Sequence, residues 1–274
     1  MTDLEKLAVR IRIAEMKCFK KRGFGHVGGS LSIVDTLAAL YGKLMKYDPA
    51  NPQWEGRDYL IMSKGHCGPG LYAALAVEGF FPEEWLMTLN EPRTKLPSHC
   101  DKNLTPGIDM STGSLGQGAS TSAGMALAAK LNGQENKVFC ILGDGECDEG
   151  QVWEMLLFAA ARKLNNYVVF VDYNHKQLDG STDDVLPLGD LRAKFEAFGW
   201  YAVDVNGNDP DAVANAVETG FAQNGDRPIA VILHTKKGFG VDFIEEMEFN
   251  HHITLTEEEA DRAIGQLERR LTND

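Results

Sequence analysis

Short apolar runs alternate along the chain with longer segments in which apolar residues recur every three or four positions. The short runs have the length and composition of buried parallel strands, and the periodic segments are typical of helices packed on a sheet. We expect strands at residues 58–62, 138–142, 167–171, 200–205 and 229–233. We expect helices at residues 4–22, 33–44, 71–77, 119–131, 149–164, 188–198 and 211–223, and a last one at 256–271 with Thr256 as its N-cap. The alternation predicts an α/β fold with a doubly wound, mainly parallel sheet flanked by helices.

The centre of this pattern is a strand, a helix and a second strand between residues 138 and 171. The first strand runs into the turn Gly143-Asp144-Gly145, and the second is followed by Asp172-Tyr173-Asn174. In a βαβ unit the carboxyl ends of both strands lie at the same edge of the sheet, which is where open α/β sheets bind ligands. We therefore expect Asp144 and Asn174 to lie close together at a ligand-binding edge.

The residue types at this edge suit a magnesium ion and a phosphate. Asp144 offers a carboxylate oxygen, Asn174 an amide oxygen, and Lys176 a backbone carbonyl. Mg²⁺ commonly completes such an oxygen set with water and phosphates. Gly143 and Gly145 would let backbone N–H groups approach a phosphate near the start of the next helix. The alternative is a plain strand-to-helix turn in which Asp144 only caps the helix.

These residues resemble a known motif. A GDG turn, a helix and an Asn thirty residues after the Asp resemble the thiamine-diphosphate motif, and the string GDGECDEGQVWEM…LDG resembles its transketolase branch. The resemblance covers nearly the whole chain. It implies the thiamine-diphosphate-binding fold, thiamine diphosphate and Mg²⁺ as cofactors, and Asp144, Asn174 and the carbonyl of Lys176 as metal ligands.

Several loops extend the resemblance. His26 stands in a glycine-rich loop at residues 25–30, where the family has a Pro in place of Val27 and a His that contacts substrate. His66 follows Ser-Lys-Gly, as does the family's His that reaches the diphosphate, and His99 matches a His that faces the substrate channel. By residue type alone, the glycines around His26 favour a surface or ligand-facing residue over a core histidine, and His66 could be an incidental residue of a helix-capping loop.

Two further segments match less closely. Residues 111–118 resemble a loop whose backbone lies against the thiazolium and diphosphate, which assigns Gly113, Ser114 and Leu115 to cofactor binding although Ser114 replaces a Pro. Where the family has Trp-His-Gly, this chain has Asn250-His251-His252, so His251 takes the role of touching diphosphate and substrate and His252 has no assigned role.

Glu149 and Glu154 fall where the family places interface carboxylates, although acids at a helix start also favour the helix dipole. Together the resemblance assigns catalytic roles to His26, His66, His99, His251, Glu149 and Glu154, and cofactor-binding roles to His66, Gly113, Ser114, Leu115, Gly143, Asp144, Gly145, Asn174 and His251.

The resemblance also implies a reaction and a partner. Transketolases transfer a two-carbon ketol unit from a ketose to an aldose, often as sugar phosphates, and a second, pyrimidine-binding domain follows the part matched here. We therefore expect the N-terminal subunit of a split transketolase, inactive without a C-terminal partner subunit, in an α2β2 assembly. The small-residue faces of residues 119–131 and 155–161 would be buried against that partner. The alternatives are the alpha subunit of a 2-oxoacid dehydrogenase and a non-catalytic module that binds Mg²⁺ and phosphate.

Composition narrows the remaining possibilities. The 274 residues, 43% of them hydrophobic, fit one domain, residues 1–274, with a C-terminal helical extension. A net charge of −13 without a basic stripe argues against nucleic acid. Five cysteines without framework spacing fit a reducing cytoplasm. We see no signal peptide, and the uncharged run at residues 110–129 is too rich in Gly, Ser and Thr to predict a membrane span.

Overall fold

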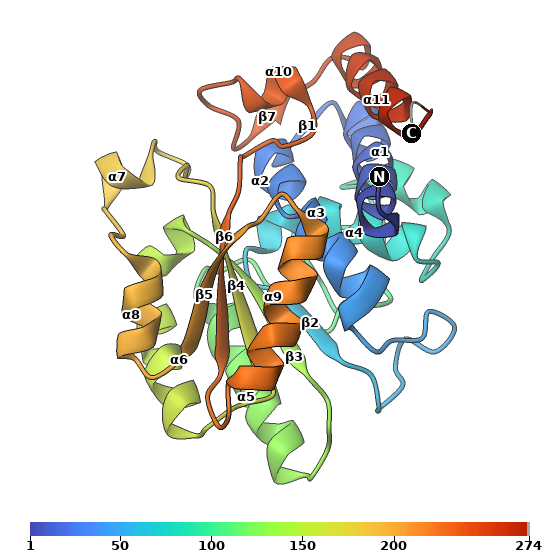
Figure 1. Cartoon of the computed structure of the whole chain (residues 1–274). Helices are drawn as coiled ribbons and strands as arrows, with labels where there is room; N and C mark the ends of the chain where they lie inside the picture. The colour runs from blue at the N-terminus through green and yellow to red at the C-terminus, as the bar shows by residue number, and fades with distance from the viewer. Residues whose placement is uncertain (273–274) are drawn as a thin grey trace.

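A parallel sheet forms the centre of the molecule. The computed structural model describes residues 1–272, and within them five parallel strands follow the order β2-β3-β4-β6-β5 (Figure 1). They are β2 (Tyr59–Met62), β3 (Val138–Gly143), β4 (Tyr167–Tyr173), β5 (Tyr201–Asn206) and β6 (Ile229–His234). The predicted strands and the doubly wound α/β class are confirmed.

Helices cover both faces of the sheet (Figure 1). One face carries α1 (Asp3–Arg22), α2 (Val27–Ser32), α3 (Val34–Ala39), α4 (Gly68–Val77), α9 (Pro210–Gln223) and, outermost, α11 (Glu257–Thr272). The other carries α5 (Gln117–Leu131), α6 (Gly150–Ala161) and α8 (Leu191–Ala197). The remaining elements are short: a π-helical turn at Leu40–Leu44, 3₁₀ turns at Gly65–Cys67, Glu83–Thr88 and Gly145–Asp148, α7 (Thr182–Val185), α10 (Asp242–Glu245), and the antiparallel pair β1 (Phe24–Gly25) and β7 (Ile253–Thr254).

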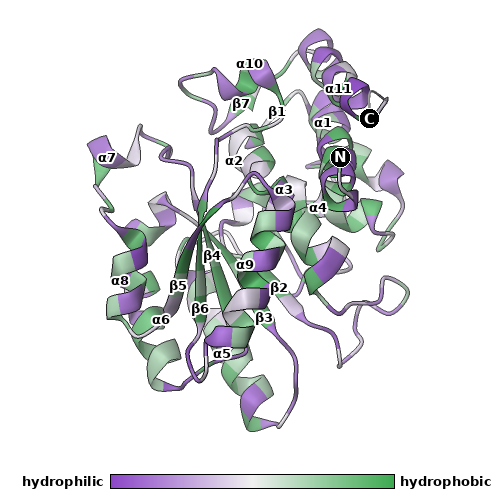
Figure 2. Cartoon of the chain, viewed as in Figure 1, coloured by the Kyte–Doolittle hydropathy of each residue, from purple (hydrophilic) through white to green (hydrophobic). Residues whose placement is uncertain are grey.

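The apolar runs in the sequence exist because the strands are buried on both faces, except for the edge strand β5, which is only partly buried. In β3, Phe139 and Ile141 pack into the core under α1, α3 and α4, whereas Val138, Cys140 and Leu142 pack into the core under α5 and α6. Figure 2 shows hydrophobic strands at the centre of the molecule, surrounded by helices of mixed polarity. A strand that contacts a hydrophobic core on each of its faces has no polar face. Hydrophobic and polar residues therefore do not alternate along its sequence.

Some predicted boundaries were wrong. Residues 27–30, expected in a loop, begin the fully buried helix α2. Its glycines allow close packing: a Cβ on Gly28 would overlap the carbonyl of Asn250, and one on Gly29 would lie 3.1 Å from the sulfur of Cys67. Tertiary packing thus overrides the low helix propensity of glycine.

Two predicted helices also differ from those observed. The single helix expected at 33–44 is divided into α3 and the π-helical turn. The helix expected at 149–164 ends at Ala161, because Arg162 is its C-cap and Lys163 has a left-handed φ of 54°.

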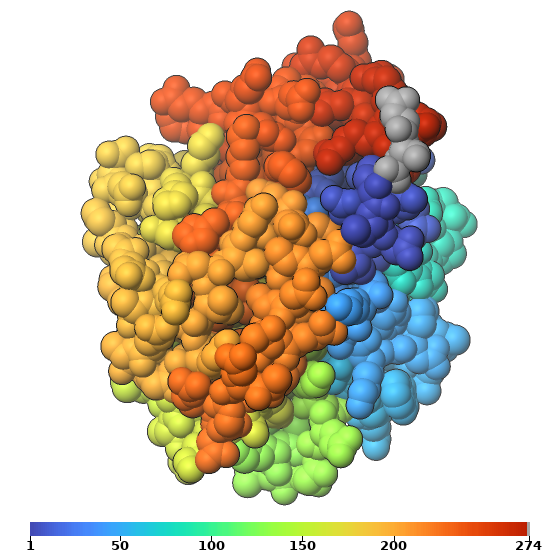
Figure 3. Space-filling model, in the orientation of Figure 1, coloured from blue at the N-terminus to red at the C-terminus, as the bar shows by residue number. Residues whose placement is uncertain are grey.

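The two ends of the described chain lie together. Helix α11 packs against α1, and Figure 3 shows the C-terminal segment directly on the N-terminal one. Lys20 and Asp261 join the two helices through an ion pair of 2.6 Å. Within residues 1–272, no helix is both long and apolar enough to cross a membrane.

Candidate active site

Asp144 lies at the carboxyl end of β3 with one oxygen unused. The register pairs Gly143 with Asp172 on β4, so the ends of the two strands meet at one edge. Oδ1 of Asp144 accepts a 2.8 Å hydrogen bond from the Gly145 N–H. Its Oδ2 is buried and has no hydrogen-bond partner within residues 1–272. Burial, together with the nearby Asp172 carboxylate, raises the pKa of Asp144 to about 7. This edge therefore favours a cation.

Asn174, which follows β4, presents its amide in a fixed orientation. Its Nδ2 donates to Asp172 Oδ2 at 2.8 Å, and its Oδ1 accepts the Lys176 N–H at 3.0 Å. Because Asp172 can only accept when ionised, the amide nitrogen must face it and the amide oxygen must face the Lys176 loop. Asn174 and Asp144 line one cavity, as the sequence predicted.

Asp172 organises this edge, and sequence reasoning missed it. The Lys64 ammonium pairs with Asp172 Oδ2, Ser32 donates to the same oxygen at 2.6 Å, and Thr235 donates to Oδ1. Burial opposes ionisation of Asp172, but the Lys64 charge and these hydrogen bonds lower its pKa overall. Asp172 is thus ionised and internally neutralised, so it supports Asn174 rather than competing for a cation.

The donor set at this edge fits Mg²⁺. Asp144 Oδ2, Asn174 Oδ1 and the Lys176 carbonyl are hard oxygens, and the first is buried without a partner in the described chain. Within residues 1–272, no three His, Cys, Asp or Glu side chains are arranged so that they could hold a metal ion by themselves.

The glycine turn differs in part from the expectation. The N–H of Gly143 donates to Glu146 Oε2 at 3.1 Å and that of Gly145 to Asp144, so neither is directed at a phosphate in this conformation. Glu146 also accepts the Gly116 N–H at 2.9 Å and the Ser63 hydroxyl. This buried carboxylate, absent from the sequence predictions, joins the turn to the loop before α5.

The four histidines predicted as site residues line the cavity at this edge. His26, His66, His99 and His251 line a cavity of about 220 Å³ together with Gly113, Leu115, Asp144, Asn174, Lys64, Lys176 and Lys237. The ring centroid of His26 lies 5.1 Å from that of His66, 5.9 Å from that of His99 and 5.3 Å from that of His251. Segments far apart in the chain thus supply one imidazole cluster.

Burial and crowding keep these imidazoles neutral near pH 7. Burial, followed by neighbouring positive groups, lowers the pKa of His26 to about 4, of His66 to about 2 and of His251 to about 3. Burial also lowers the pKa of His99. A neutral imidazole has one donor and one acceptor nitrogen, so each can hydrogen-bond a hydroxyl or carbonyl oxygen.

His251 and His252 occupy different places. The Nδ1 of His251 lies 3.1 Å from the ammonium of Lys237 inside the cavity. His252 lies against the outer side of His26, with ring centroids 4.9 Å apart, and against Phe24. The structure therefore places His251 at the predicted edge and His252 nearer the surface.

Three predicted site residues do not line the cavity. Ser114, Glu149 and Glu154 are exposed, and Glu149 is the N-cap of α6. Gly113 and Leu115 line the cavity, while the side chain of Ser114 lies outside its lining. A Cβ on Gly65 would lie 2.7 Å from the backbone of Thr112, so a glycine is required where this loop meets the His66 turn.

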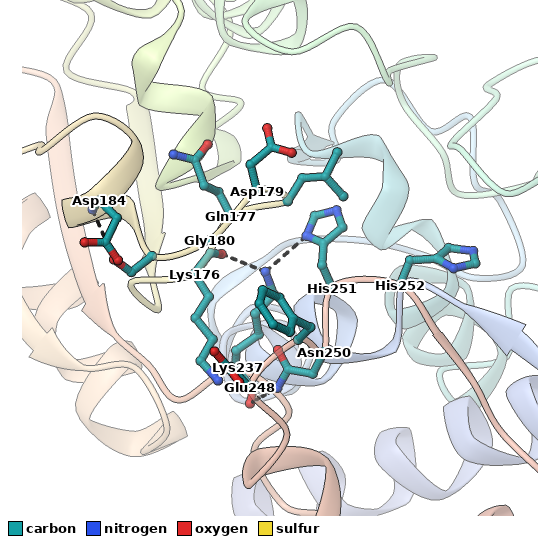
Figure 4. A pocket seen from close by; sticks show the side chains of 13 residues that line it. Lys176, Gln177, Asp179, Gly180, Asp184, Lys237, Glu248, Asn250, His251 and His252 are labelled. Atoms are coloured by element: carbon teal, nitrogen blue, oxygen red, sulfur yellow. Dashed lines mark hydrogen bonds between the residues drawn. The ribbon is translucent and has the colours of Figure 1, made fainter.

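A second, larger cavity, whose lining side chains are drawn in Figure 4, adjoins the first. It measures about 430 Å³, lies between the segments 176–184 and 248–252, and shares Lys176, Lys237 and His251 with the smaller cavity. Lys237 stands between the two and was not predicted from the sequence, because a lysine in a loop carries no distinguishing pattern.

Comparison with known proteins agrees with this geometry. A family model described as "Transketolase, thiamine diphosphate binding domain" matches residues 4–269. The chain is 49% identical over 267 residues to the 6-deoxy-6-sulfo-D-fructose transketolase subunit SqwG of a Clostridium species, covering 97% of each protein. It is 39% identical to an apulose-4-phosphate transketolase subunit of Actinobacillus succinogenes, covering 97% of this chain and 96% of that one.

A solved structure shows the same fold. The transketolase of Campylobacter jejuni superimposes with a TM-score of 0.90 at 29% identity, over 98% of this chain and 43% of that one. The chain therefore spans less than half of that transketolase but nearly the whole length of the subunit relatives.

Proposed function

Because this chain belongs to the transketolase family, as an N-terminal subunit of a split enzyme with a thiamine-diphosphate-binding domain, we propose that it holds the metal and the diphosphate at the edge formed by β3 and β4. The observation that carries this proposal is the buried, unpartnered Oδ2 of Asp144 beside the oriented amide of Asn174. These two oxygens and the Lys176 carbonyl would hold Mg²⁺. When bound, thiamine diphosphate supplies the electron sink for ketol transfer.

The imidazoles contribute positioning and proton transfer. His26, His66, His99 and His251 are neutral near pH 7, so they can hydrogen-bond the sugar hydroxyls and the diphosphate without carrying a charge. In this proposal His66 and His251 lie toward the diphosphate, and His26 and His99 toward the sugar. Gly113 and Leu115 line the cavity, and the cofactor would lie against them.

The partner completes the site. We propose that the whole chain acts as one domain and that a C-terminal subunit carries the pyrimidine-binding half, in an α2β2 assembly. Glu149 and Glu154 are exposed on and beside α6, as interface carboxylates would be before assembly. Five buried, unpaired cysteines, all within the described residues, fit a cytoplasmic enzyme.

The substrate class follows from the subunit relatives. Their names give a ketose with a terminal sulfonate and a sugar phosphate, so we propose an anionic ketose as donor, with 6-deoxy-6-sulfo-D-fructose as the first to test. The substrate of the 49% identical subunit takes precedence over that of the 39% identical one.

The test uses the complex of this chain with its partner. Calorimetry would measure thiamine-diphosphate binding in Mg²⁺ for the natural chain, Asp144→Asn, and Asp226→Asn as the control. Asp226 makes the same carboxylate-to-amide change at an exposed ion pair with Lys163. We expect Asp144→Asn to weaken Mg²⁺-dependent binding by about 100-fold or more, since outer-shell changes alone cost roughly 10–100-fold at metal sites.

Two results would contradict the proposal. Unchanged cofactor affinity in Asp144→Asn would show that the metal does not bind at this edge. Ketol transfer by the lone subunit, at the rate of the assembled enzyme, would show that the partner does not complete the site.

A further inference from the structure

Lys237 joins the metal edge to the histidine cluster. It is 4% exposed, and its ammonium donates to the Lys176 carbonyl at 2.7 Å and lies 3.1 Å from His251 Nδ1 (Figure 4). Its backbone is fixed as well, because the Asn250 side chain donates to the Lys237 carbonyl at 2.9 Å. A side chain held at both ends in this way has a defined position.

The chemistry of this contact determines where His251 carries its proton. A lysine ammonium has three N–H donors and no acceptor. While Lys237 is protonated, the Nδ1 of His251 is the acceptor, which leaves the proton of a neutral imidazole on Nε2. In Figure 4 the other ring nitrogen of His251 points away from Lys237. His251 then meets its ligand as a hydrogen-bond donor.

We propose that Lys237 is a positioning residue that holds His251 in the Nε2–H tautomer, so that His251 acts on substrate and cofactor as a donor. This rests on the proposed function for the identity of the ligands, but not for the tautomer itself. Anionic or carbonyl oxygens, which only accept, are the groups that an Nε2–H recognises.

Lys237 also explains why the two halves of the site are linked. The carbonyl that it contacts belongs to Lys176, whose N–H in turn fixes the Asn174 amide oxygen. One ammonium thus spans the loop after β4 and the segment that carries His251. A change in the position of Lys237 would therefore alter both the Lys176 carbonyl and the His251 imidazole.

The adjacent lysine is a matched control. Lys236 is exposed and pairs with Glu245 at 2.6 Å, and it does not line either cavity. Lys236→Met removes the same charge one residue away and leaves the cavity unchanged.

The test is nuclear magnetic resonance of the full chain labelled with ¹⁵N-histidine and free of cofactor. Long-range ¹H–¹⁵N correlations distinguish the two tautomers, and the His251 signals are identified by their loss in His251→Gln. We expect an Nε2–H pattern in the natural chain and in Lys236→Met, and tautomer-averaged nitrogen shifts in Lys237→Met. Because no cofactor is present, a failure of the proposed function cannot produce or conceal this result.

A kinetic readout on the assembled enzyme follows. We expect Lys237→Met to lower kcat by about tenfold or more, because a donor in the wrong tautomer loses part of the roughly 10²–10⁴-fold that acid–base groups contribute. The proposal is overturned if the nitrogen shifts of His251 are the same in Lys237→Met as in the natural chain. It is also overturned if the natural chain itself shows an Nδ1–H pattern, a result that needs no variant to fold.

Discussion

Replacement of Glu15 by glutamine should remove a pH-dependent loss of folding stability that arises in the core. Glu15 lies on α1, is fully buried, and neither carboxyl oxygen has a hydrogen-bond partner within residues 1–272. Burial raises its pKa to about 8, although Arg12 and Lys64 partly oppose the shift. Those two cations are already paired with Asp35 and Asp172, so neither neutralises Glu15 directly.

The magnitude follows from the difference between folded and unfolded chains. Between its ordinary pKa of 4.5 and about 8, the folded chain retains a proton on Glu15 that the unfolded chain releases. The free energy of unfolding therefore falls as pH rises through this window and stays low above it. At about 1.4 kcal/mol per pKa unit, the full window corresponds to an order-of-magnitude loss of about 5 kcal/mol.

Glutamine keeps the shape of a protonated carboxyl but does not titrate. Urea unfolding followed by circular dichroism at about pH 5 and about pH 8.5 would compare Glu15→Gln with the natural chain and with Glu258→Gln, an exposed acid on α11. We expect Glu15→Gln to gain several kcal/mol relative to the natural chain between the lower and the higher pH. Glu258→Gln should show no such gain. A stability difference that is the same at both pH values would refute the reasoning.

Two further predictions concern helices of the other face. Gly118→Ala should destabilise the chain by about 1–3 kcal/mol in urea unfolding, because its Cβ would lie 2.7 Å from the Ser63 Cα. Gly124→Ala on the same helix has no atom of the described chain within 4 Å of the new Cβ, so it should stabilise the chain by about 0.5–1 kcal/mol. A change in unfolding free energy of the same sign for both variants would contradict this packing. Leu157, which is 60% exposed on α6, should lie in the proposed subunit interface. Leu157→Glu should therefore weaken subunit assembly, measured by sedimentation velocity, while leaving the unfolding free energy of the lone subunit unchanged. Assembly of this variant with the same affinity as the natural chain would show that this face is not part of the interface.

Much of the fold and the family could be predicted because buried strands require apolar residues, which are visible as short runs in the sequence. The five apolar runs are strands since each supplies two cores, and the βαβ rule then brings Asp144 and Asn174 to one edge. The transketolase resemblance is confirmed by the family match and the subunit relatives, which do not support the 2-oxoacid dehydrogenase alternative. The roles of the individual site residues stay predictions.

The residues that sequence reasoning missed are those whose meaning depends on a distant partner. Lys64 is paired with Asp172, 108 positions away, and Lys237 with the carbonyl of Lys176, 61 positions away. Neither pairing leaves a periodic pattern. Helix α2 was missed for the opposite reason, because its glycines indicate a loop locally although they are required by close packing on Asn250 and Cys67.

The charges at the sheet edge support the proposed cation site. Asp144 directly follows β3, and Asp172 lies near the end of the neighbouring strand β4. Two buried carboxylates placed in this way repel each other. Lys64 neutralises Asp172 within the protein, and that carboxylate is then used up in hydrogen bonds that orient Asn174. Asp144 keeps an oxygen without a partner in the described chain, while the Lys237 ammonium contacts the carbonyl beside it. The fold thus pairs one acid with a lysine and leaves the other with an oxygen that is available to the proposed cation.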